Sequence, residues 1–159
     1  RFAENYLYPG VREGLAALRK IGCRLAAVTS ETRCELEYTL SFFDLVPFFA
    51  ATVAVDEVAH RKPEPDSLLR GLELLRGTPE TAVYLGDSPS DLRAARAAGV
   101  TSVAALWGGQ PPEALLAEGP DAVFQTFAAF VGWVRGRVSS PGRAAFPAES
   151  RFVPPVLRS

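Results

Sequence analysis

The sequence has 159 residues and lacks methionine altogether, with two cysteines and one histidine. Because its first residue is Arg1 and no start methionine is present, we expect the chain to begin inside a longer protein. Cys23 and Cys34 do not have the spacing of metal ligands, which favours two buried, reduced thiols. We therefore expect a cytoplasmic protein. His60 has no serine or cysteine nucleophile motif beside it, so we expect an exposed loop residue and no catalytic triad.

An excess of charge of one sign is also lacking. The net charge is -1, and the 17 basic residues are scattered, so the sequence predicts no nucleic-acid or acidic-membrane partner. The apolar run TFAAFVGWV near the end is too short to span a bilayer, and we expect no signal peptide in the first residues given, since they lack a charged-then-apolar pattern. What is present is 48% hydrophobic residues, enough for one domain with a sizeable core.

Short apolar runs alternate with segments of helical period along most of the sequence. Strands that are continuously apolar and separated by helices are typical of a parallel sheet. We therefore predict an α/β fold with a mostly parallel sheet that helices cover on both faces. The expected strands lie within residues 23–30, 48–56, 81–87, 100–108 and 121–126, and the expected helices within residues 11–22, 31–43, 66–77, 89–99, 111–119 and 127–137.

The composition changes near the end of the chain. Residues 1–137 carry the alternating pattern and are expected to form the folded core, whereas residues 138–159 are rich in Pro, Ser and Gly without any period. We expect the second segment to be an irregular or disordered tail. Within the core, Asp66 is predicted to cap the helix that follows it.

Polar residues follow the first three predicted strands at the point where each strand ends. In an open parallel sheet, ligands bind beyond the carboxyl ends of the strands, so these residues are expected to face one crevice. They are Thr29 and Ser30 after the first strand, Asp56 and the loop that carries Lys62 after the second, and Gly86, Asp87 and Asp91 after the third.

These residue types suit a metal and a phosphate. Mg²⁺ prefers oxygen ligands and shares them with substrate phosphate, which favours Asp87 as a ligand, with Asp91 binding directly or through a metal-bound water. The hydroxyls and amides of Thr29 and Ser30 can donate hydrogen bonds to phosphate oxygens. Lys62 can neutralise the charge that develops on a transferring phosphoryl group.

Each residue also has a simpler interpretation. Asp91 is in a position to offset a helix dipole, Lys62 can be a solvated loop lysine, and Thr29 is a common residue at a strand end. Asp56 and Glu57 are expected to be solvated loop acids. The joint occurrence of the hydroxyl, the ammonium and the carboxylates, in order and each at its own strand end, favours the functional interpretation.

The segments LAAVTS, RKPEPD and YLGDSPSDLRAARAAGV resemble the haloacid dehalogenase-like superfamily, most closely its phosphoglycolate phosphatase-like branch. The resemblance covers Tyr8 to Arg135 and implies a three-layer, Rossmann-like fold. It implies that Thr29 binds the phosphoryl group, that Lys62 is the lysine of the third motif, and that Asp87 and Asp91 hold Mg²⁺. The implied partner is a small phosphorylated metabolite.

The sequence departs from this family at its first motif. The DxDxT-like strand end that supplies the nucleophilic aspartate is not found in the 159 residues, and the helical cap that selects the substrate is largely missing. That strand is the central one of the family's sheet, so we expect a gap beside the strands that end at Thr29 and Asp87. Without the nucleophile, the chain alone is expected to be inactive.

The leading hypothesis is a fragment of a Mg²⁺-dependent phosphatase that works through an aspartyl-phosphate. A related phosphomutase is an alternative, because the cap and the first motif decide between the two. A non-catalytic module that binds Mg²⁺ or phosphate is another, because the first motif is absent. A haloacid dehalogenase needs no Mg²⁺ and is not expected to carry the acidic pair. In response-regulator receivers the acids precede the Thr and Lys, whereas here they follow.

Overall fold

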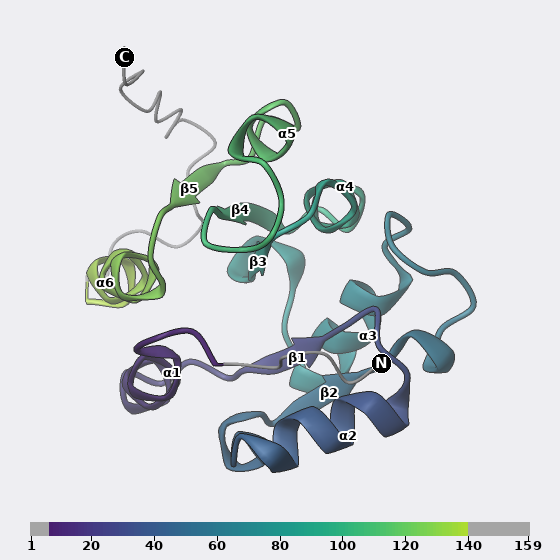
Figure 1. Cartoon of the computed structure of the whole chain (residues 1–159), viewed down its shortest axis with the longest axis horizontal. Helices are drawn as coiled ribbons and strands as arrows, with labels where there is room; N and C mark the ends of the chain where they lie inside the picture. Colours follow the sequence, from purple (N-terminus) through teal and green to yellow (C-terminus); the bar gives the residue numbers. More distant parts are fainter. Residues whose placement is uncertain (1–6, 140–159) are drawn as a thin grey trace.

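A computed structural model describes residues 7–139 as an alternation of helices and strands (Figure 1). The predicted order of elements is confirmed throughout this range. The helices are α1 (Val11–Lys20), α2 (Arg33–Phe42), α3 (Asp66–Leu75), α4 (Pro89–Ala97), α5 (Pro112–Leu116) and α6 (Phe127–Val138), and the strands are β1 (Ala26–Val28), β2 (Ala51–Val53), β3 (Val83–Gly86), β4 (Thr101–Ala105) and β5 (Ala122–Phe124), with short 3₁₀ turns at Val46–Phe48, Val55–Glu57 and Pro79–Thr81.

The strands pair in parallel, as predicted, but they form two sheets. β1 pairs with β2, and β3, β4 and β5 follow one another in the second sheet. Within residues 7–139, no strand joins β1 to β3, and Figure 1 shows the two sheets as separate groups of arrows. This interruption confirms the gap expected beside the strands that end at Thr29 and Asp87.

Helices cover both faces of the sheets and give three layers. On one face, α1, α2 and α6 bury a core that includes Leu15, Leu36 and Phe130. On the other face, α3 and α4 pack against Val28 and Tyr84 through a smaller cluster of buried residues. Neighbouring residues of a strand point to opposite faces, so β1 and β3 contribute residues to both clusters. The predicted three-layer α/β architecture is confirmed.

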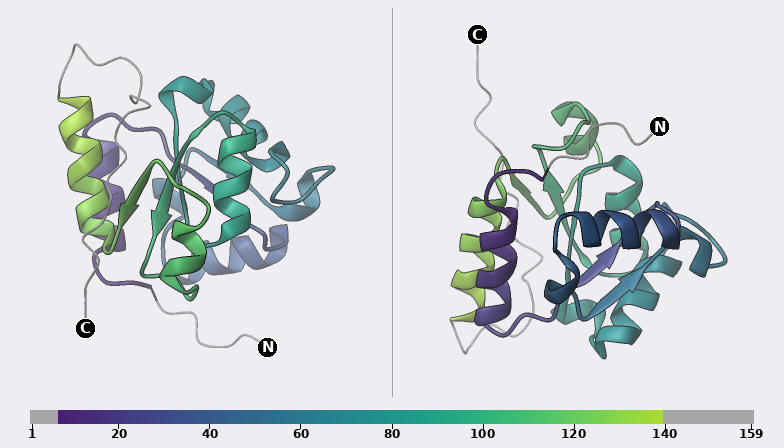
Figure 2. Two further views of the ribbon diagram at one scale, coloured as in Figure 1. Left: turned by 90° about the horizontal axis from the view of Figure 1, so that it is seen from above. Right: turned by 60° about the horizontal axis from the view of Figure 1, so that its bottom comes forward.

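The first and last helices of the described chain, α1 and α6, pack closely against each other. Figure 2 shows α1 and α6 side by side. A side chain at Gly14 would begin 2.4 Å from the ring of Phe127, so a larger residue at this crossing would have to displace that ring. α6 continues through Val138, and the remainder of the expected tail, residues 140–159, lies outside the described residues.

Two local predictions were wrong. Asp66 does not cap α3 but is its first residue, and Pro65 occupies the cap position. The Asp66 carboxylate instead accepts a hydrogen bond from the backbone N–H of His60. Cys23 is half-buried, and Cys34 is exposed because it lies on the outer side of α2 and not on its buried stripe.

Among residues 7–139, none of the helices has the length and apolar character that a membrane span needs.

Candidate active site

The turn from β3 into α4 builds a capping box around Asp91. Ser88 is the N-cap of α4, and its hydroxyl accepts a hydrogen bond from the backbone N–H of Asp91 at 3.2 Å. In return, Oδ2 of Asp91 accepts from the backbone N–H groups of Asp87 and Ser88, each at 3.2 Å. These bonds satisfy amides that the first helical turn would otherwise leave unpaired. Asp91 therefore has the structural role of a first-turn acid.

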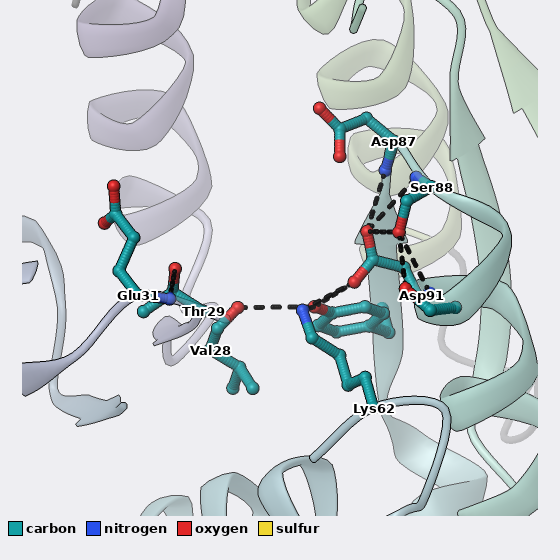
Figure 3. A network of polar contacts seen from close by, with 9 residues as sticks. Val28, Thr29, Glu31, Lys62, Asp87, Ser88 and Asp91 are labelled. Carbon is teal, nitrogen blue, oxygen red and sulfur yellow. Dashed lines mark hydrogen bonds and ion pairs between the residues drawn. The ribbon is translucent and has the colours of Figure 1, made fainter. Parts of the chain in front are cut away.

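The second oxygen of Asp91 holds Lys62. Nζ of Lys62 lies 2.6 Å from Oδ1 of Asp91, and only 7% and 8% of the two side chains are exposed. The same ammonium donates to the hydroxyl of Tyr84 at 3.1 Å (Figure 3). Lys62 is therefore not a solvated loop lysine. The loop after β2 and the start of α4 meet in a buried ion pair.

Tyr84 extends this network across the interruption between the sheets. Its hydroxyl lies 3.2 Å from Oδ1 of Asp91 and 3.3 Å from the backbone oxygen of Val28, so its single proton donates to one of these two acceptors. Val28 is the last residue of β1, whereas Tyr84 belongs to β3. Sequence reasoning missed Tyr84, because its position in an apolar strand is typical of a core residue.

The charges in this cluster shift the pKa values of its members. Burial raises the pKa of Tyr84 well above its ordinary value, and the negative charge of Asp91 adds to the effect, so the phenol stays protonated. Burial alone would raise the pKa of Asp91, but the ammonium of Lys62 and the hydrogen bonds from Lys62, Ser88 and Tyr84 outweigh it and lower the pKa. Asp91 is therefore a stable carboxylate.

Asp87 lies directly after β3 and is exposed, although protein atoms crowd one side of its carboxyl group. This partial burial raises its pKa, and the nearby negative charge of Asp91 raises it further. Gly86 makes the arrangement possible, since a side chain there would begin 2.3 Å from Cβ of Asp91. Two carboxylates with opposite pKa shifts thus stand side by side at the end of β3.

The residues after β1 lie at the same edge but outside this hydrogen-bonded cluster. The hydroxyl of Thr29 accepts from the backbone N–H of Glu31 at 3.1 Å, and Ser30 is exposed. Figure 3 places Thr29 next to Val28, across from Lys62. Among the residues drawn there, no hydrogen bond joins Thr29 to Lys62, Asp87 or Asp91.

Asp56 and His60 do not join the site. Asp56 is exposed and accepts a hydrogen bond from the backbone N–H of Arg33 at 2.9 Å. Glu57 is also exposed and forms an ion pair with the side chain of Arg33. His60 is an exposed loop residue, as expected, and its Nδ1 lies 3.0 Å from Asp66. The acids that follow β2 therefore stabilise the loop and α2.

Asp87 and Asp91 are the two neighbouring carboxylates at this edge that could contact a metal ion. No group of three or more His, Cys, Asp and Glu side chains that could hold a metal ion occurs within residues 7–139. Mg²⁺ often keeps several waters and takes only one or two carboxylates together with substrate phosphate. The exposed carboxylate of Asp87, with Asp91 beside it, fits that requirement. Both oxygens of Asp91 already accept hydrogen bonds, which favours contact through water over direct ligation.

Comparisons with known proteins show what the chain is similar to. The sequence profile of the haloacid dehalogenase-like hydrolase family matches residues 2–105. A Caldanaerobacter subterraneus protein, provisionally named pyrophosphatase PpaX, is 43% identical over 70% of this chain and 50% of its own length. Phosphoglycolate phosphatase of Salmonella paratyphi A is 34% identical over 77% of this chain and 49% of its own length.

A solved structure has the same fold. The Thermotoga maritima protein, provisionally named β-phosphoglucomutase, superposes with a TM-score of 0.74 at 31% sequence identity, covering 80% of this chain and 59% of that one. The chain spans about half the length of the curated relatives it matches.

Proposed function

The chain belongs to the haloacid dehalogenase-like hydrolase family, and we propose that its residues form part of a Mg²⁺-dependent phosphatase of small phosphorylated metabolites. The observation that carries the proposal is the buried contact between Lys62 and Asp91 beside the exposed carboxylate of Asp87. A fixed ammonium and an exposed carboxylate at one sheet edge match the needs of a phosphate and a hard cation.

In this proposal each residue has one task. Asp87 would hold Mg²⁺ directly and Asp91 would contact it through water, and the ion would supply positive charge to a bound phosphate. Lys62 stabilises the charge that develops on the phosphoryl group during transfer, and the neighbouring Asp91 fixes its direction. Thr29 and Ser30 donate hydrogen bonds to the phosphate oxygens from the end of β1.

The nucleophile in this proposal is an aspartate outside the 159 residues. Its carboxylate oxygen attacks phosphorus, the bond to the ester oxygen breaks, and the released alkoxide takes up a proton. Water then attacks the aspartyl-phosphate and releases inorganic phosphate with regeneration of the carboxylate. The interruption between β1 and β3 supports this source, because a strand inserted there would end between Thr29 and Asp87.

The test is an assay of the full-length protein on p-nitrophenyl phosphate and small phosphomonoesters, with Mg²⁺ and with a chelator. We expect hydrolysis that requires Mg²⁺ and that Asp87→Asn abolishes. Asp44→Asn is the matched control, since the Asp44 side chain is 84% exposed and pairs with Arg12. Equal activity in Asp87→Asn and wild type would overturn the assignment of Asp87.

A phosphomutase is the second candidate, favoured by the superposition on the Thermotoga maritima structure. The two functions differ in what leaves the site, since a mutase returns the phosphoryl group to a sugar and releases little inorganic phosphate. Measurement of released phosphate against isomerised sugar phosphate separates them. A non-catalytic binding module would bind Mg²⁺ or phosphate and yield neither product.

A further inference from the structure

The loop after β4, residues 106–111, passes beside Asp87. β3 and β4 are neighbours in the same parallel sheet, and Gly86 pairs in register with Ala104. The segments that leave the two strands therefore emerge at the same edge. Asp87 is the first residue after β3, so the beginning of the loop after β4 lies next to it.

This loop is held in place at its start. The backbone N–H of Leu106 donates to the carbonyl of Phe124 at 2.9 Å, which continues the pairing of β4 with β5. The ring of Trp107 packs edge-on against Phe127, with the centroids 6.2 Å apart. Trp107 is half-buried against the main core. These contacts of Leu106 and Trp107 fix the position of the next residue, Gly108.

The loop packs so closely against Asp87 that a side chain at Gly108 would not fit. A Cβ atom on Gly108 would lie 2.4 Å from Cβ of Asp87 and 2.7 Å from its Oδ2. The Cβ of Asp87 is bonded directly to the backbone, so rotation of the side chain cannot relieve this contact. A Cβ on the next residue, Gly109, would meet nothing within 4 Å. Neither glycine has a positive φ, so backbone conformation does not explain glycine at 108.

We propose that Gly108 is a positioning residue for Asp87. Because residue 108 has no side chain, the anchored loop after β4 packs directly against Asp87 and fixes the direction of its carboxylate. Gly86 has the equivalent contact with Asp91, so each carboxylate of the pair packs against its own glycine. The significance for metal binding rests on the proposed function, in which Asp87 holds Mg²⁺. The packing contact between Gly108 and Asp87 is independent of that function.

The contact is tested first without metal, by urea unfolding of the full chain in a chelator. We expect Gly108→Ala to lower the unfolding midpoint and Gly109→Ala to leave it unchanged. Asp87→Gly removes the Cβ atom that would clash with a side chain at residue 108. In that background, Gly108→Ala should not lower the unfolding midpoint further. If Gly108→Ala alone does not fold, Asp87→Gly should restore folding. An equal loss in both backgrounds, or no restoration, would overturn the proposal.

The consequence for the site is tested by calorimetric titration with Mg²⁺. We expect Gly108→Ala to raise the dissociation constant about 10-fold or more, as is usual when a group that orients a ligand is disturbed. Gly109→Ala should change it by less than about twofold. Equal Mg²⁺ binding by Gly108→Ala and wild type would contradict the positioning role. If Asp87→Asn binds Mg²⁺ as wild type does, the metal assignment fails, and the unfolding experiment alone decides the positioning role.

Discussion

The Nζ atom of Lys62 lies 2.6 Å from Oδ1 of Asp91, and both side chains are almost completely buried. Lys62 belongs to the loop after β2, whereas Asp91 belongs to the first turn of α4. Their contact joins a segment of the first sheet to a segment of the second. The cation of Lys62 is thus held in a buried ion pair, and the contribution of that pair to stability can be measured.

Asp91→Ala should destabilise the chain strongly. The substitution leaves the ammonium of Lys62 buried without a counter-ion, which costs about 3–5 kcal/mol of unfolding free energy. Glu73→Ala is the control, because Arg70 and Glu73 form an exposed pair on α3 that contributes less than about 1 kcal/mol. Urea unfolding at pH 7 measures both. Equal losses in the two variants would contradict a buried pair.

Acid should remove the stabilisation that Asp91 provides. Although burial opposes it, the attraction of Lys62 keeps the pKa of Asp91 in the fold below its ordinary value. A lowered pKa stabilises the fold above the unfolded value of about 3.9, and the contribution is lost as the pH falls through the folded value. The difference in stability between wild type and Asp91→Ala should therefore shrink below about pH 4. A difference that stays constant from pH 7 to pH 2 would contradict this.

Asp87→Asn should have the opposite effect and stabilise the metal-free chain at neutral pH. Burial and the neighbouring charge of Asp91 raise the pKa of Asp87, so its ionised form is disfavoured in the fold. This cost is present above the folded pKa and disappears as the pH falls toward the unfolded value of about 3.9. Melting temperatures in a chelator should be higher for Asp87→Asn at pH 7 and converge with wild type near pH 4. A lower melting temperature at pH 7 would show that Asp87 has a stabilising partner.

Tyr84→Phe should weaken the link between the two sheets. The phenol oxygen accepts a hydrogen bond from Lys62, and the O–H group donates to Asp91 or to the carbonyl of Val28. Its removal leaves buried polar groups short of a partner, at a cost of about 1–3 kcal/mol. Urea unfolding measures the loss. In the phosphatase assay we expect a smaller decrease than Lys62→Met causes, since Lys62 keeps its contact with Asp91.

The alternating pattern predicted the order of the described elements, because continuously apolar strands and helices of 3.6-residue period bury different surfaces. It also placed Lys62, Asp87 and Asp91 at one sheet edge. It could not show that Lys62 is buried, since the contact with Asp91 depends on how two separate segments meet. Gly108 within LWGGQPP resembles any glycine of a turn, and only the structure shows how closely it packs against Asp87.

The role of Lys62 is tested most directly by phosphomonoester hydrolysis at saturating Mg²⁺ in the full-length protein. Lys62→Met should reduce kcat by about 10²–10³-fold, as does loss of one group that stabilises transition-state charge. Lys20→Met is the matched control, because Lys20 lies exposed at the end of α1, and its activity should equal that of wild type. Wild-type activity in Lys62→Met, with Lys20→Met unchanged, would contradict the account.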